Sequence, residues 1–139
     1  MTMCRVLVVD GDADAAELLC ELIGRLGHDC RFTGSSTDAL REAAGFLPDV
    51  VIMDLGSPYT TGLDLARALR DLLAGRRLYL AALTAWDHLD VLSATRQAGF
   101  HFHALKPAGV DLLSSIMRCA AEAPADPRDH AGRPVDTGG

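Results

Sequence analysis

Residues 50–54 read Val50-Val51-Ile52-Met53-Asp54, a continuous apolar run that ends on a carboxylate. Such a run is typical of a strand buried on both faces, as in a parallel sheet. A second run, Arg5-Val6-Leu7-Val8-Val9, ends on Asp10 in the same way. We predict five strands in all, the others lying at 78–83 before Thr84, at 28–32, and at 101–105 before Lys106-Pro107.

Helical patterns separate these strands. Apolar residues recur at three- and four-residue spacing, the period of a helix that packs one face against a core. Ser35 or Ser36 supplies an N-cap, and Gly27 and Pro48 mark helix ends. The expected buried residues are Ala15, Leu18, Leu19, Leu22, Ile23 and Leu26; Ala39, Leu40, Ala43 and Leu47; Leu65, Leu69, Leu72 and Leu73; and Leu112, Leu113, Ile116, Met117 and Ala120, with a further helix at about 87–98. Five strand–helix units with short connections predict an α/β fold, a parallel sheet with helices on both faces.

The composition fits a single globular domain. The chain has 139 residues, 49% of them hydrophobic, and a formal net charge of −6. Nucleic-acid binding requires a basic face, and a membrane span requires roughly 20 consecutive apolar residues. The sequence shows neither feature and no signal peptide, so we predict a cytoplasmic protein that binds neither nucleic acid nor membrane. We predict a folded domain at 1–121 and a disordered tail at 122–139, and the starting Met favours a stand-alone protein.

The four cysteines, Cys4, Cys20, Cys30 and Cys119, lie far apart in the sequence. Because no two of them form a tight pair, we interpret them as reduced, small core residues of a cytosolic protein. A zinc site at His28 and Cys30 is disfavoured, since structural zinc sites show closely spaced ligand pairs.

The residues just past the predicted strands carry the chemistry. In open parallel sheets, ligands bind outside the carboxyl ends of the strands. The residues placed there are Asp10, Asp12, Asp54, Thr84 and Lys106, the only lysine of the chain. The carboxylates would repel one another unless a cation joined them, and partly hydrated oxygen ligands suit Mg²⁺. A carboxylate beside Mg²⁺, with a lysine and a threonine to hold anionic oxygens, can attack a phosphoryl group.

Several ordered segments resemble the receiver domain of two-component response regulators. They are Val6-Leu7-Val8-Val9-Asp10, Pro48-Asp49-Val50-Val51-Ile52-Met53-Asp54, Pro58 with Gly62, Leu83-Thr84-Ala85, and Ala98-Gly99 followed by Lys106-Pro107. The segments at 14–18, 98–100 and 103–107 further resemble receivers that stand alone or end a hybrid histidine kinase. The resemblance covers residues 5–120. It implies a flavodoxin-like (βα)5 fold with a doubly wound, parallel, five-stranded sheet in the order 2-1-3-4-5.

This resemblance implies a phosphoryl site and a metal site. Asp54 matches the phosphoacceptor, which takes a phosphoryl group from the phosphohistidine of a histidine kinase or phosphotransfer protein. Asp10 matches the first member of the acidic pair that helps to hold Mg²⁺. Asp54 itself and the backbone carbonyl of Gly56 match the other metal ligands.

The resemblance also implies switch residues. Thr84 would bond a phosphoryl oxygen and shift on phosphorylation, and Lys106 would pair with Asp54 or its phosphate. His103 stands at the position of the aromatic residue that rotates inward when the threonine moves. Members of the family have a cis peptide at the bond that precedes Pro107. The signal would then pass to a downstream protein partner.

The chain departs from the family pattern at two positions. The second acid of the pair, which binds Mg²⁺ directly, is replaced by Gly11, so we expect weaker Mg²⁺ binding with water in the vacant position. Asp12 is a further candidate ligand, and its other interpretation is an acid that complements a helix N-terminus. Thr61 stands where the family has Asp before Gly62, and we expect it to lie outside the reaction centre.

Two other functions stay open at this point. A pseudo-receiver would keep the fold and signal by binding alone, because Gly11 weakens the metal site. An enzyme is the third, since Val9-Asp10-Gly11-Asp12 resembles the opening of haloacid-dehalogenase-type phosphatases, in which the two acids are nucleophile and acid/base. Asp54 would have no role there, so we expect a phosphoacceptor with at most self-phosphorylation and self-dephosphorylation. Trp86, near Thr84, could cover the mouth of the site or bind a partner.

Overall fold

The computed structural model describes residues 3–56, 60–85 and 89–123. The predicted fold is confirmed, because five parallel strands form one sheet in the order β2-β1-β3-β4-β5. The elements are β1 (Arg5–Val9), α1 (Ala13–Arg25), β2 (Asp29–Thr33), α2 (Ser36–Phe46), β3 (Val50–Leu55), α3 (Thr60–Leu72), β4 (Tyr79–Thr84), α4 (Leu89–Gln97), β5 (Phe102–Leu105) and α5 (Val110–Glu122).

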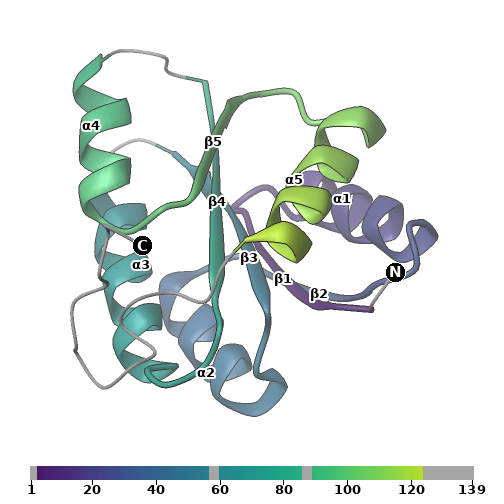
Figure 1. Ribbon diagram of the computed structural model, residues 1–139, viewed down its shortest axis with the longest axis horizontal. Helices are drawn as coiled ribbons and strands as arrows, with labels where there is room; N and C mark the ends of the chain where they lie inside the picture. The colour runs from purple at the N-terminus through teal and green to yellow at the C-terminus, as the bar shows by residue number, and fades with distance from the viewer. Residues whose placement is uncertain (1–2, 57–59, 86–88, 124–139) are drawn as a thin grey trace.

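The sheet is the middle of three layers (Figure 1). Helices α1 and α5 cover one face, and α2, α3 and α4 cover the other. The apolar runs are buried because they face helices on both sides: Val51, Ile52 and Leu80 have no exposed surface. This arrangement brings the carboxyl ends of all five strands to one edge.

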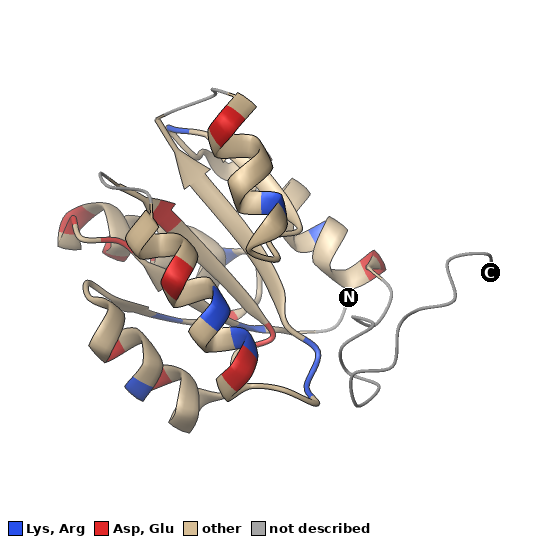
Figure 2. Cartoon of the chain, turned by 90° about the vertical axis from the view of Figure 1, so that its left-hand side faces the viewer, with Lys and Arg blue, Asp and Glu red and all other residues tan. Residues whose placement is uncertain are grey.

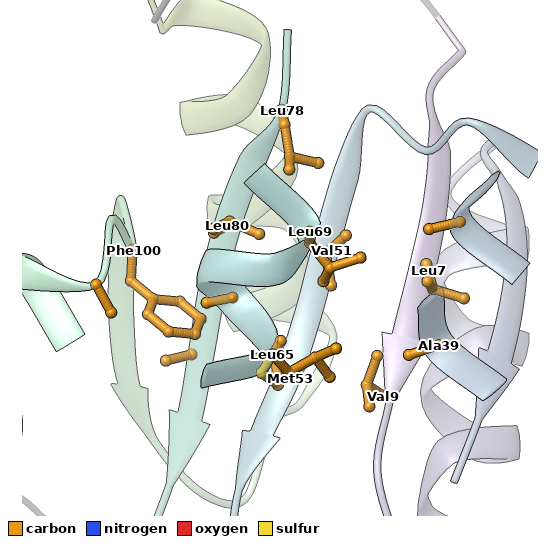
Figure 3. Close-up of a cluster of buried hydrophobic side chains, with 14 of the residues drawn as sticks. Leu7, Val9, Ala39, Val51, Met53, Leu65, Leu69, Leu78, Leu80 and Phe100 are labelled. Atoms are coloured by element: carbon orange, nitrogen blue, oxygen red, sulfur yellow. The ribbon is translucent and has the colours of Figure 1, made fainter. Parts of the chain in front are cut away.

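Each face of the sheet has its own hydrophobic core. Figure 3 shows the cluster beneath α2 and α3, which includes Leu7, Met53, Leu65 and Leu69. The second cluster lies beneath α1 and α5 and includes Val8, Ile52, Leu113 and Ile116. Alternate strand residues enter opposite clusters, as the pleat of a strand requires.

Local signals set the helix ends. Ser35 is the N-cap of α2, since its side chain accepts a hydrogen bond from the Asp38 N–H. Gly27, just past α1, has φ of 95°, a conformation that favours glycine. Leu47 ends α2 in the left-handed region with φ of 54°, just before Pro48. These signals confirm the helix ends that the sequence predicts.

The predicted buried faces are wrong at two leucines. Leu18 on α1 is 55% exposed and Leu72 on α3 is 45% exposed. Both lie at the flank of an apolar stripe, where residue spacing does not show how far the neighbouring elements extend. In α2, Phe46 is buried where the pattern placed Leu47. Cys119 is exposed, so its assignment to the core is also wrong.

Helix α5 continues to Glu122, one residue past the predicted end of the domain at 121. The remainder of the proposed tail, Trp86, Pro58 and Tyr59 lie outside the described residues. Among the residues that the structure describes, no helix has the length and hydropathy to span a membrane. Basic and acidic residues are interspersed along the helices in Figure 2. Some of them form ion pairs, such as Arg67–Asp64 and Arg41–Asp38.

Candidate functional site

The predicted site residues come from the carboxyl edge of the sheet. Asp10 follows β1 directly, and Asp54 lies near the end of β3. Thr84 is the last residue of β4 and pairs in register with Leu55 and Leu105. Lys106 follows β5, and its N–H donates to the Thr84 carbonyl at 2.9 Å. The register of the strands therefore fixes where these residues lie relative to one another along the carboxyl edge of the sheet.

An ion-pair cluster forms the centre of the site. The Lys106 Nζ lies 2.7 Å from Asp54 Oδ1 and 3.8 Å from Asp10 Oδ2. The three side chains come from three different strand ends, and the bond between Lys106 and Pro107 is cis. The ammonium group thus partly neutralises two neighbouring carboxylates.

Asp10 is the most deeply buried member of this cluster, with 3% of its surface exposed. Burial raises the pKa of its carboxyl group above the usual value, and the negative charge of Asp54 raises it further. The Asp12 N–H, which donates to Asp10 Oδ1 at 2.9 Å, and Lys106 oppose this rise. The fold thus holds Asp10 where its charge is unfavourable without a cation.

A cavity of about 220 Å³ opens beside the two carboxylates. Its lining includes Asp10, Asp54, Gly11, Gly56 and Thr61. Thr61, which we expected to lie outside the reaction centre, therefore borders the same cavity as the two carboxylates. The further lining residues are Val9, Gly34, Ser35, Ser36, Met53, Gly62 and Leu65.

The donors around this cavity suit a hard cation. Asp10 and Asp54 supply carboxylate oxygens, and Gly56 borders the same cavity with its backbone. Within the described ranges, no group of three His, Cys, Asp or Glu side chains forms a metal cage. A Mg²⁺ ion held here would therefore keep several water ligands, as Mg²⁺ commonly does.

Gly11 leaves open space at the position of the missing acid. A Cβ atom built on Gly11 meets no atom within 4 Å, and the backbone there is outside the left-handed region. The contrast is Gly62, where a Cβ would lie 2.4 Å from Leu55 Cδ2. A side chain at position 62 would require the Leu55 side chain to move, whereas a Cβ atom at position 11 meets nothing.

Asp12 is occupied as a helix cap. Its Oδ1 accepts hydrogen bonds from the Asp14 and Ala15 N–H groups at 3.1 and 3.2 Å. It is not among the residues that line the cavity beside Asp54. This geometry favours the helix N-terminal interpretation of Asp12 over a role as a metal ligand.

The two predicted switch residues lie on the strands next to β3 and beyond it, Thr84 at the end of β4 and His103 within β5. Thr84 is fully buried, and neither it nor His103 lines the cavity beside Asp54. His103 lies in β5 opposite Ala82 of β4 and is partly exposed. The structure therefore places both residues on the adjacent strands β4 and β5.

A second hollow, which the sequence did not reveal, lies on the other side of Asp10. It has a volume of about 190 Å³ and is lined by α1 and the turn after β5, mainly by Ala15, Leu18, Leu19, Pro107 and Ala108. Asp10, Leu83 and Lys106 complete the lining. We call it the α1 groove. The exposed Leu18, counted as core in the sequence, forms part of its wall.

Sheet order and site together define a receiver domain, and comparison with known proteins agrees. The chain belongs to the response regulator receiver domain family, whose sequence model matches residues 6–118. The DNA-binding response regulator MtrA of Mycobacterium tuberculosis is 36% identical over 104 residues, which cover 74% of this chain and 44% of that protein. The transcriptional regulatory protein KdpE of the same species is 34% identical over 118 residues, which cover 85% of this chain and 51% of that protein.

The chain spans about half the length of these curated relatives. Among solved structures, the CheY-like receiver domain of Methylobacillus flagellatus matches with 27% identity and a TM-score of 0.72, covering 86% of this chain and 99% of that one. The CheY-like receiver of Methanospirillum hungatei matches with 20% identity and a TM-score of 0.76, covering 87% of this chain and 96% of that one, which shows a shared fold.

Proposed function

We propose that this receiver domain accepts a phosphoryl group on Asp54 from the phosphohistidine of a histidine kinase or phosphotransfer protein. The observation that carries the proposal is the 2.7 Å contact between Lys106 Nζ and Asp54 Oδ1 at the open edge of the sheet. This contact holds the Lys106 ammonium group against Asp54, the carboxylate at the end of β3 that borders the cavity. The proposal makes the chain a phosphoacceptor and not a metabolic enzyme.

The transfer requires an in-line approach of two groups. An Asp54 carboxylate oxygen attacks phosphorus, the P–O bond forms, and the P–N bond to the donor imidazole breaks. The electron pair of that bond stays on the imidazole nitrogen, which takes a proton. Lys106 is placed to balance the anionic charge on the phosphoryl oxygens, because it already contacts the acceptor.

Asp10, Asp54 and the Gly56 carbonyl are the residues that would hold Mg²⁺. When bound, the ion would neutralise the charge that develops on the transferring phosphoryl oxygens. The ion would also stabilise the ionised form of Asp10, because the protein alone does not fully balance the charge of this buried carboxylate. Because Gly11 removes one ligand, we expect Mg²⁺ to bind more weakly but not to be lost. Phosphoryl transfer should then need a higher Mg²⁺ concentration.

The α1 groove supports docking of the donor helix. Its apolar walls, Leu18 and Ala108, adjoin Lys106 and Asp10 at the reaction site, so a helix seated there would bring its phosphohistidine near Asp54. After transfer, Thr84 and His103 would convey the change to the surface of β5 and α5. A downstream protein partner would recognise that surface.

The test uses a small-molecule acyl phosphate, which needs no partner. We expect a mass gain of one phosphoryl group that depends on Mg²⁺ and is absent in Asp54→Asn. The Gly11→Asp variant should reach half-maximal labelling at an at least tenfold lower Mg²⁺ concentration, because it supplies a carboxylate where space exists. Gly11→Ala is the matched control and should behave like the unaltered chain.

The alternative is a pseudo-receiver, which Gly11 specifically favours. It predicts no labelling of the unaltered chain at any Mg²⁺ concentration, together with labelling of Gly11→Asp. Labelling that survives in Asp54→Asn would also overturn the proposal. The phosphatase alternative gains no support, because Asp12 caps α1 and Asp54 belongs to the ion-pair cluster.

A further inference from the structure

Strand β2 forms the lateral edge of the sheet, at the opposite end of the strand order from β5 (Figure 1). On its inner side, the Asp29 N–H donates to the Cys4 carbonyl at 3.0 Å, so Asp29 is one of the residues that bond to β1. Backbone groups alternate in direction along a strand, and every second residue therefore faces the outer side. Cys30 and Phe32 direct their N–H and C=O groups away from β1.

These outward groups are available to another strand. Within residues 3–56, 60–85 and 89–123, no backbone hydrogen bond joins Cys30 or Phe32 to a neighbour on the outer side. Unpaired backbone groups at the edge of a sheet are a template for a further strand. Phe32 is also 42% exposed. Strand β2 therefore offers both hydrogen-bonding groups and apolar surface to a partner strand.

The charged residues of β2 indicate which strand can pair with it. Asp29 and Arg31 are exposed, carry opposite charges and flank Cys30. They lie on the same face of the sheet, because side chains alternate between the faces along a strand. When two β2 strands pair antiparallel with Cys30 at the centre, Asp29 of each copy lies opposite Arg31 of the other. These opposite charges attract, whereas a register centred on Arg31 would place two arginines opposite each other.

Contacts within the domain hold Arg31 on this face. Its Nη1 lies 3.2 Å from Glu42 Oε2, and its Cζ lies 4.5 Å from the centroid of the Phe46 ring. The Arg31 side chain is still 54% exposed, and a guanidinium group has five N–H donors. Arg31 can therefore bind a second carboxylate, from another copy, without leaving Glu42.

We propose that β2 is a self-association surface, on which a second copy of this chain pairs antiparallel and extends the sheet, with Cys30 at the two-fold axis. The Cys30 N–H of each copy donates to the Cys30 carbonyl of the other, as in a hydrogen-bonded antiparallel pair. The two Asp29–Arg31 pairs lie on either side, at non-hydrogen-bonded positions where side chains approach more closely. The same surface is used by both copies, as a closed dimer requires.

Two variants that each repel themselves test this register by sedimentation equilibrium. Asp29→Arg places arginines opposite each other, and Arg31→Glu places acids opposite each other. Each variant alone should therefore dimerise at least tenfold more weakly than the unaltered chain. In an equal mixture, the Asp29→Arg copy meets the Arg31→Glu copy with opposite charges at both positions. The mixture should form a heterodimer that is at least tenfold tighter than either homodimer.

The matched control uses another pair of exposed charges. Asp64→Arg and Arg67→Glu make the same changes in net charge at an ion pair on α3. Each of these variants should dimerise like the unaltered chain, and mixing them should bring no gain. The proposal is overturned if the unaltered chain stays monomeric at every concentration, or if the mixture of the two β2 variants associates no better than its components.

A measurement without substitutions covers the case in which a variant fails to fold. Backbone amide exchange of the unaltered chain is followed by NMR as the protein concentration is raised. The Cys30 amide should become at least tenfold more protected, because pairing supplies an acceptor for it. The Arg31 amide faces β1 in the same strand, so it is the internal control and its exchange rate should not change. Equal behaviour of the two amides would contradict the pairing.

Discussion

The two edges of the sheet use the same kinds of polar side chain for opposite purposes. At the amino edge, polar side chains form hydrogen bonds with backbone groups. The Cys4 N–H donates to His28 Nδ1 and the Leu80 N–H donates to His101 Nδ1, each at 3.0 Å. Arg77 Nη2 donates to the carbonyls of Ala120 and Ala123. At the carboxyl edge, Lys106 contacts both Asp10 and Asp54, and the two carboxylates line a cavity.

This contrast indicates how the fold divides stability from function. At the amino edge, the polar side chains hold the chain ends of β1, β4 and α5 and stabilise the fold. At the carboxyl edge, two carboxylates share one lysine, so the local charge is unfavourable until a cation binds. Substitutions at the two edges should therefore change stability with opposite signs.

The largest expected change is at Arg77. Arg77→Met removes both hydrogen bonds to the end of α5, and we expect a loss of about 1.5 kcal/mol in the free energy of unfolding. Urea denaturation measures it. Arg76→Met, a substitution at the adjacent exposed arginine, should change stability little, and an equal loss in both variants would contradict a specific role for Arg77.

The opposite sign is expected at Asp10. Asp10→Asn keeps an oxygen that can accept from the Asp12 N–H and removes a buried charge beside Asp54, so the protein should become more stable by about 1 kcal/mol. Thermal denaturation at pH 7 without Mg²⁺ measures this gain, and the same variant should lose phosphoryl labelling. Asp64→Asn, at an exposed acid, is the control. A destabilised Asp10→Asn protein would show that the cluster supports the fold.

The smallest effect concerns pH and His28. Burial lowers the pKa of His28, so the unfolded chain, in which histidine has a pKa of about 6.5, binds the proton more readily than the folded protein. The contribution of His28 to stability is therefore complete above this pH and falls as pH drops below it. His28→Asn offers an acceptor for the Cys4 N–H that does not titrate, and it should flatten the fall in melting temperature between pH 7 and 5. An unchanged slope would assign the pH dependence to other groups.

How much the sequence could predict differs between these edges. Asp10, Asp54 and Lys106 each follow or end an apolar run, and parallel strands bring such residues to one edge, so their meeting could be predicted. The bonds of His28, His101 and Arg77 join segments far apart in the chain, and no local pattern signals them. His101, although exposed, stacks on Tyr79 with ring centroids 4.9 Å apart.

The α1 groove shows a further limit of sequence patterns. Helical periodicity placed Leu18 in the core because it lies next to Leu19 on the apolar stripe. Whether a flanking leucine is buried depends on how closely the turn after β5 approaches, and that distance is set by the whole sheet. Residues at the edge of a stripe therefore need the three-dimensional structure before a core or surface role is assigned.

The open space at Gly11 has a consequence for how this protein can evolve. A change of one base at the second position of a glycine codon gives a codon for aspartate or glutamate. Because a Cβ atom at this position meets no atom within 4 Å, the first side-chain atom of either residue would fit without a clash. A carboxylate beside the cavity of Asp10 and Asp54 is thus a single mutational step away, and lineages could gain or lose it at this position.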